Sequence, residues 1–180
     1  DGGDELSWIG WLSIARSQLD DLAPLLASKK EIAEAGFPHA VLLGMGGSSL
    51  AAAVMGQTFG SQGSFPDLLV LDSTDPAQIR AVQQAIDLGR TLFIVASKSG
   101  STLEPNVLYA FFSDLVQKAR GPDRTGSQFI AITDPGSKLE SKAKADGFRR
   151  VFRGVKSIGG RYSALSNFGM VPAAVMGLDM

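Results

Sequence analysis

The stretch Ser97-Lys-Ser-Gly-Ser-Thr102 places several hydroxyl side chains directly behind the apolar run 91–96. A long segment with apolar residues at helical spacing follows it, so the stretch is predicted to be a loop between a strand and a helix. Hydroxyl groups and the backbone N–H groups at a helix N-terminus together suit an anionic ligand. The phosphate group of a small molecule is the ligand that this loop fits best.

Four side chains of the loop can donate an O–H to a phosphate: Ser97, Ser99, Ser101 and Thr102. One helix cap needs a single hydroxyl, for which Ser101 or Thr102 is expected, so the others remain for a ligand. Lys98 either adds positive charge or is a solvated side chain. Glu104 lies in the predicted first helical turn, where the helix dipole stabilises a carboxylate, and could equally anchor another loop or a sugar hydroxyl.

A second loop, Gly44-Met-Gly-Gly-Ser-Ser49, follows the earlier apolar run 39–45. Its glycines permit a tight turn and close approach of the backbone to a ligand, and Ser48 and Ser49 can cap a helix or bind a ligand oxygen. A purely structural turn is an equally good interpretation. The spacing differs from the dinucleotide-binding and lysine-containing nucleotide loops, which favours a smaller phosphorylated ligand over a nucleotide.

The third motif is Ser157-Ile-Gly-Gly-Arg-Tyr-Ser163. Two glycines before Arg161 let the backbone turn sharply, so the guanidinium can be directed inward. An arginine stays protonated and can stabilise an oxyanion with its fixed set of donors, although an ordinary surface arginine fits the pattern too. Ser163 is predicted to be the N-cap of the last helix.

The elements that position these motifs alternate between strand and helix. Apolar residues at helical spacing run from Glu5 to about Ser28, divided at Pro24, and Trp8 and Trp11 of this segment are expected to cover the core or a neighbouring domain. The predicted strands are 39–45, 68–72, 91–96, 128–133 and 149–152. The predicted helices are 49–59, 76–88, 102–119, 137–146 and the segment from 163 onward, with 120–126 as a mobile surface loop.

This alternation predicts an α/β fold, a three-layer sandwich around a five-stranded parallel sheet. We expect this domain to span residues 36–180 and a helical segment to span 1–35. Ligands of such sheets bind outside the carboxyl ends of the strands, near the point where the strand order reverses. The two hydroxyl-containing loops both follow strands and are therefore predicted to lie at that edge.

Composition excludes several kinds of protein. The chain has 180 residues, 44% of them hydrophobic and 19% charged, so a folded domain with a core is expected. A net charge of −1 provides no electrostatic attraction to nucleic acid or to a membrane surface. The absence of cysteine excludes disulfides and thiolate metal sites, and one histidine leaves little scope for zinc. Because neither a membrane-spanning run nor a signal peptide is visible, we expect a cytoplasmic protein.

Together, the motifs resemble the sugar isomerase (SIS) fold, which is Rossmann-like, and more closely the N-terminal half of the glucose-6-phosphate isomerase family. Residues 44–49 resemble that family's Gly-x-Gly-Gly-Ser loop, and 97–104 resemble its Ser-Lys-Thr-x-x-Thr-x-Glu phosphate loop. Residues 159–166 resemble its Gly-Gly-Arg-(Phe/Tyr)-Ser-x-x-Ser signature, which simpler SIS proteins that only sense sugar phosphates lack. The resemblance covers about residues 35–180.

The resemblance implies roles for particular residues. Arg161 would stabilise the enediolate formed as glucose 6-phosphate and fructose 6-phosphate interconvert, a reaction that needs no cofactor and no metal. The residues implied to bind the substrate and its phosphate are Gly47, Ser48, Ser97, Lys98, Ser99, Thr102 and Glu104. Because 99–101 read Ser-Gly-Ser where the commonest isomerases carry Thr-Phe-Thr, mannose 6-phosphate is an alternative substrate.

The family's glutamate base, ring-opening histidine and C-terminal lysine come from later segments, and no motif here matches them. His39 lies at the start of the first predicted strand and is expected to be structural. We therefore expect a substrate-binding part that is inactive alone, with a second SIS domain on the same polypeptide and a homodimer as partners. A transaldolase fused upstream is one arrangement known in relatives of this type. Loss of the second domain is expected to expose apolar surface around Met170 and Val175.

Two other functions stay open. A non-catalytic SIS sensor would bind a sugar phosphate in order to regulate a partner, and would not need the arginine at position 161. A domain that acts on amino sugars would prefer glucosamine 6-phosphate to glucose 6-phosphate.

Overall fold

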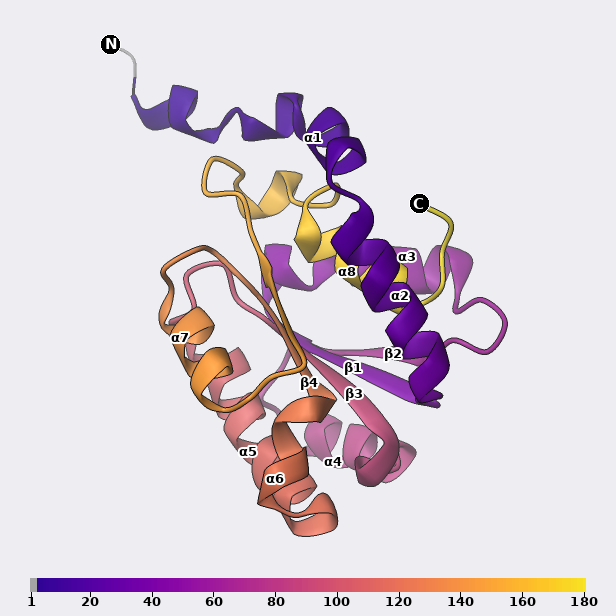
Figure 1. Ribbon diagram of the computed structural model, residues 1–180. Helices are drawn as coiled ribbons and strands as arrows, with labels where there is room; N and C mark the ends of the chain where they lie inside the picture. Colours follow the sequence, from indigo (N-terminus) through magenta and orange to yellow (C-terminus); the bar gives the residue numbers. More distant parts are fainter. Residues whose placement is uncertain (1–2) are drawn as a thin grey trace.

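The computed structural model describes residues 3–180 and has three layers, a parallel sheet between two layers of helices (Figure 1). Five strands form the sheet in the order β2-β1-β3-β4-β5, and all neighbouring pairs are parallel. Their bounds are β1 (His39–Gly44), β2 (Asp67–Leu71), β3 (Thr91–Ala96), β4 (Phe129–Thr133) and β5 (Arg150–Arg153). The predicted α/β three-layer fold is confirmed.

Three helices cover one face of the sheet, and their apolar side chains share one core cluster with the strands: α2 (Ala23–Ala35), α3 (Leu50–Phe59) and α8 (Asn167–Val175). The other face is covered mainly by α4 (Pro76–Ala85), α5 (Leu103–Arg120) and α7 (Lys138–Ala145). Successive residues of β1 alternate between the two clusters, with Ala40 and Leu42 in the first and Val41 and Leu43 in the second. A parallel strand covered on both faces is apolar throughout, which is why the central strands read as continuous apolar runs.

The region of residues 4–35 is less regular than its periodicity predicts. It begins with short 3-10 helices at Asp4–Trp8 and Gly10–Leu12, and regular helix starts with α1 (Ile14–Asp20). Pro24 lies in the first turn of α2, a position where its missing N–H costs nothing, so the chain divides just before it.

Three further expectations are wrong. The segment expected to be a mobile loop contains the short helix α6 (Pro122–Thr125). The N-cap of α8 is Ser166 and not Ser163, because Ser166 accepts the N–H of Phe168. Apolar surface is not exposed around Val175, which is fully buried because α8 packs between α2 and α3 on the sheet, and Met170 is half-buried. Within the described residues, no helix has the length and apolar character that crossing a membrane requires.

Candidate functional site

The two hydroxyl-containing loops lie side by side at the carboxyl edge of the sheet. β1 and β3 are neighbours, and their last residues, Gly44 and Ala96, are register partners. In the sheet, β2 lies on the side of β1 that faces away from β3, whereas β4 lies on the side of β3 that faces away from β1. The strand order therefore reverses between β1 and β3. The crevice at such a reversal is the usual ligand site of an open α/β sheet.

The helices that follow these two strands differ in how they begin from the helices that follow β2, β4 and β5. Side chains cap the N-termini of α4, α7 and α8, from Asp75, Ser137 and Ser166. The N-cap residues of α3 and α5 are Ser49 and Thr102, and neither side chain makes a cap hydrogen bond. Their first-turn N–H groups therefore lack the usual side-chain acceptor, at the two helix ends that face the crevice.

The loop after β3 is wound around Ser97. The Ser97 side chain is buried; its Oγ accepts the N–H of Gly100 at 3.1 Å and donates to Thr102 Oγ1 at 3.2 Å. Gly100 has a φ of +69°, and a Cβ there would lie 2.8 Å from the backbone nitrogen of Leu139 on α7. Because of these contacts, Ser99 is left exposed and Thr102 half-buried at the outer surface of the loop.

Lys98 is engaged within the protein. Its Nζ donates to Asp134 Oδ2 at 2.5 Å and to the carbonyls of Val155 and Lys156 at 3.3 and 3.2 Å. Asp134 follows β4 directly, and sequence reasoning missed it, although its place at a strand's carboxyl end was a signal. Lys98 thus ties the loop after β3 to the segment after β5. Glu104 is half-buried in the first turn of α5.

The two glycine motifs meet directly. A Cβ on Gly47 would lie 2.5 Å from the backbone of Gly160, so there is no room for a side chain at position 47. Ser163 Oγ makes bonds of 2.9 Å to the carbonyl of Gly47 and 2.7 Å to that of Gly160. Glycine here serves close packing of two backbones, which supports the structural interpretation of the first loop.

Three motifs line one small cavity, since Gly47, Ser48, Lys98 and Gly160 all face it. Arg161 lies next to it on a 3-10 turn (Gly160–Tyr162), exposed, in a shallow cavity of about 260 Å³ beside the start of α3. The structure therefore brings the first loop, Lys98 and the arginine motif together. His39 lies at the opposite end of β1, and its buried Nδ1 has no partner among the described residues.

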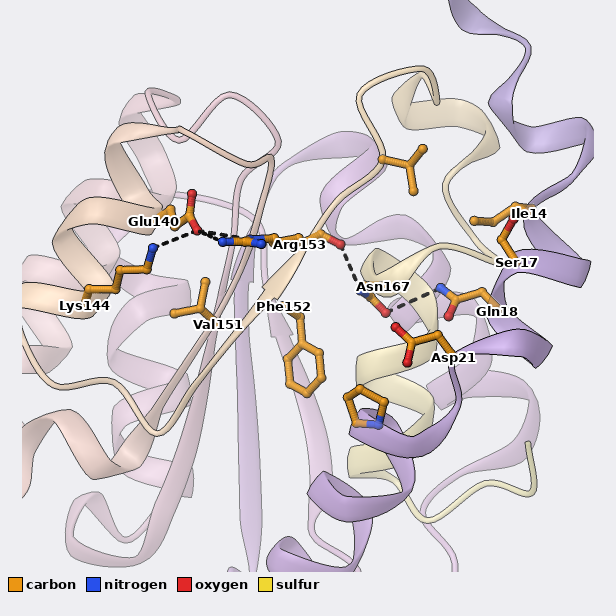
Figure 2. A pocket seen from close by; sticks show the side chains of 12 residues that line it. Ile14, Ser17, Gln18, Asp21, Glu140, Lys144, Val151, Phe152, Arg153 and Asn167 are labelled. Carbon is orange, nitrogen blue, oxygen red and sulfur yellow. Dashed lines mark hydrogen bonds and ion pairs between the residues drawn. The ribbon is translucent and has the colours of Figure 1, made fainter.

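A separate cavity of about 470 Å³ lies between α1 and β5, and none of the predicted site residues lines it (Figure 2). Glu140 Oε1 accepts bonds from both Arg153, at 3.0 Å, and Lys144, at 3.0 Å. The backbone N–H of Gly136, together with these two cations, lowers the pKa of Glu140 to about 2. Because the carboxylate already pairs with both cations, this cavity has less free charge for a ligand than its side chains suggest.

The sequence profile of the phosphoglucose isomerase family matches residues 25–180. A glucose-6-phosphate isomerase of Chlamydia trachomatis serovar A is 37% identical over 168 residues, which is 92% of this chain and 30% of that protein. The crystal structure of a glucose-6-phosphate isomerase from Chlamydia trachomatis D/UW-3/Cx superposes with a TM-score of 0.77 at 31% identity, covering 91% of this chain and 31% of that one.

A hypothetical protein from Thermus thermophilus superposes with a TM-score of 0.84 at 29% identity, over 96% of this chain and 40% of that one. The chain thus spans about 30% of the length of the curated relatives it matches. The matched region contains all three motifs of the crevice, and the chain belongs to the phosphoglucose isomerase family.

Proposed function

We propose that this chain is the sugar-phosphate-binding part of an enzyme that interconverts glucose 6-phosphate and fructose 6-phosphate. The observation that carries the proposal is the N-terminus of α5. Its first-turn N–H groups have no side-chain cap, it lies at the strand-order reversal, and a loop of hydroxyl side chains surrounds it. A phosphate would accept bonds from these groups and satisfy them.

We assign each part of the substrate to the residues whose side chains are accessible in the crevice. Ser99 and Thr102, with the first turn of α5, would hold the phosphate, while buried Ser97 keeps the loop wound. Gly47 and Ser48, on the neighbouring loop, would contact the sugar end. Lys98 contributes positive charge near the phosphate, although its pairing with Asp134 offsets part of that charge.

Isomerisation through an enediolate needs two further functions. Arg161 would stabilise the negative oxygen, because a guanidinium carries several donors in a fixed arrangement and this one is exposed beside the crevice. A base has to move a proton between C1 and C2 of the sugar. Among the described residues, Asp134 is paired with Lys98, and the resemblance assigns Glu104 to substrate binding, so we place the base on another part of the polypeptide.

A second SIS domain of the same polypeptide, and a second subunit in a homodimer, would cover the surface around the crevice. Large apolar side chains are exposed there on α3 and α5: Leu50 and Val54, 61% and 55% exposed, and Leu103 and Val107, 71% and 45% exposed. Apolar groups clustered on a surface favour burial against another protein surface.

The test is an assay that converts fructose 6-phosphate to glucose 6-phosphate, on this chain and on the complete protein. We expect activity only in the complete protein and a loss of about 100- to 1,000-fold in its Arg161→Ala variant, the range for removing an oxyanion donor. Activity of the chain alone would contradict the assignment of the base. A complete protein that binds the sugar phosphate without turnover would instead be a sensor, which is the alternative function. Tighter binding of glucosamine 6-phosphate than of glucose 6-phosphate in a competition assay would identify an amino-sugar preference.

A further inference from the structure

The first described residues lie across the loop that contains Arg161 (Figure 1). We call residues 4–12 the N-terminal segment and residues 155–162 the arginine loop. The family profile begins at residue 25, so the N-terminal segment lies outside the part of the chain that it describes.

The backbones of the two segments are in direct contact. Gly10 N–H donates to the carbonyl of Ser157 at 3.0 Å, and Ile9 forms an antiparallel bridge with Ile158. A Cβ on Gly10 would lie 2.2 Å from Ser157 Oγ and 3.1 Å from the Ser157 carbonyl oxygen, so a side chain at this position would require Ser157 to shift.

Two tryptophans extend this contact. The ring of Trp11 stacks on that of Tyr162, with centroids 5.2 Å apart and planes 17° apart. The ring of Trp8 lies 5.9 Å from Lys98 Nζ, which itself holds the carbonyls of Val155 and Lys156. The N-terminal segment thus contacts the arginine loop near both of its ends.

We propose that Trp11 is a positioning residue for Arg161: by stacking on the adjacent Tyr162, it fixes the short turn from which the guanidinium reaches the crevice. The inference rests on the proposed function, since it assigns Arg161 to the reaction. The turn has three residues, and the Arg161 side chain is exposed, so it does not anchor the turn. The stack of Trp11 on Tyr162 restrains the backbone at the neighbouring position. A catalytic group held in place beforehand avoids the cost of ordering it during the reaction.

The experiment compares Trp11→Ala, Trp11→Phe and Leu6→Ala in the complete protein. Leu6 is the matched control, because it lies on the same segment and its side chain is 77% exposed. For Trp11→Ala we expect kcat to fall about tenfold with KM within about twofold, as expected for an aromatic pair whose loss weakens only the positioning of a transition-state donor. Phenylalanine keeps a ring to stack, so Trp11→Phe should retain kcat within about twofold, as should Leu6→Ala.

Hydrogen exchange of the arginine loop provides a readout that does not depend on turnover. In Trp11→Ala we expect its backbone N–H groups to exchange about tenfold faster, and in Trp11→Phe and Leu6→Ala to exchange as in the wild type. Unchanged kcat and unchanged exchange in Trp11→Ala would overturn the proposal. Equal losses in Trp11→Ala and Leu6→Ala would also overturn it, because they would indicate a general loss of stability.

The two proposals fail in different ways. A wild-type complete protein without isomerase activity would refute the proposed function, and hydrogen exchange alone would then decide whether Trp11 holds the arginine loop. An active wild type whose Trp11→Ala variant keeps its kcat would refute the positioning role and leave the proposed function intact.

Discussion

Replacing Gly47 by alanine tests whether the contact between the two glycine motifs holds the crevice together. The new Cβ would lie 2.5 Å from the Cα, carbonyl carbon and oxygen of Gly160. Ordinary contacts of a Cβ begin near 3.4 Å, so the two backbones would have to separate by about 1 Å. Because the obstacle is backbone, no side-chain rotation can relieve it.

The energetic cost follows from two losses. Forcing an extra methyl group into a packed site costs about 1–3 kcal/mol. The separation would also stretch the 2.9 Å bond from Ser163 Oγ to the carbonyl of Gly47, worth about 1 kcal/mol. The free energy of unfolding should therefore fall by roughly 2–4 kcal/mol, which lowers Tm by roughly 6–12 °C for a chain of this size. Moving Arg161 by 1 Å would cost about 100-fold in kcat/KM in the complete protein.

Thermal unfolding of the chain and the isomerase assay on the complete protein are the measurements. Gly159→Ala is the matched control for stability, because a Cβ there meets nothing within 4 Å and its φ is −71°. We expect its unfolding free energy to stay within about 0.5 kcal/mol of the wild type. A Gly47→Ala chain whose Tm stays within about 1 °C of the wild-type value would refute the reasoning from this contact.

Three further predictions concern other residues. Ser97→Ala removes one of the two acceptors of the Gly100 N–H, which also donates to the Ser97 carbonyl, so the free energy of unfolding should fall by about 0.5–1.5 kcal/mol, and inorganic phosphate should raise Tm less than in the wild type. Lys98→Met leaves the largely buried Asp134 carboxylate without its cation and should cost roughly 1–3 kcal/mol in chemical denaturation, whereas an unchanged midpoint would contradict the pairing. Glu140 has a folded pKa of about 2 against an ordinary 4.5, so its stabilisation is complete above pH 4.5 and is lost as pH falls towards 2. Denaturant midpoints between about pH 5 and pH 2.5 should therefore decline less steeply in Glu140→Gln.

Much of the fold could be predicted from local patterns. Apolar runs of β-strand length alternate with segments of helical periodicity, and this order requires a parallel sheet with helices on both faces. In a parallel sheet every strand ends at the same edge, so the loops after β1 and β3 had to share it. Length, composition and the three motifs also sufficed to identify a small phosphorylated ligand as the best candidate.

The pairings inside the crevice could not be predicted, because they join residues far apart in the chain. Lys98 and Asp134 are separated by 36 residues, and Ser163 and the carbonyl of Gly47 by 116. No periodicity relates such positions, and only the packing of the folded chain places them within hydrogen-bond distance. For the same reason, the sequence analysis assigned Lys98 to the phosphate and missed its pairing with Asp134.

The burial of the last helix was also decided by the tertiary structure. The last helix is apolar on several sides, which fits both an exposed surface awaiting a second domain and a central position on the sheet. The strand order places it between α2 and α3, so Val175 is buried, and the exposed apolar side chains beside the crevice include those of α3 and α5 instead. The sequence thus determined which segments form strands, helices and ligand loops, since these depend on neighbours along the chain. Tertiary structure alone decided which loops touch and which charges pair, since these depend on neighbours in space.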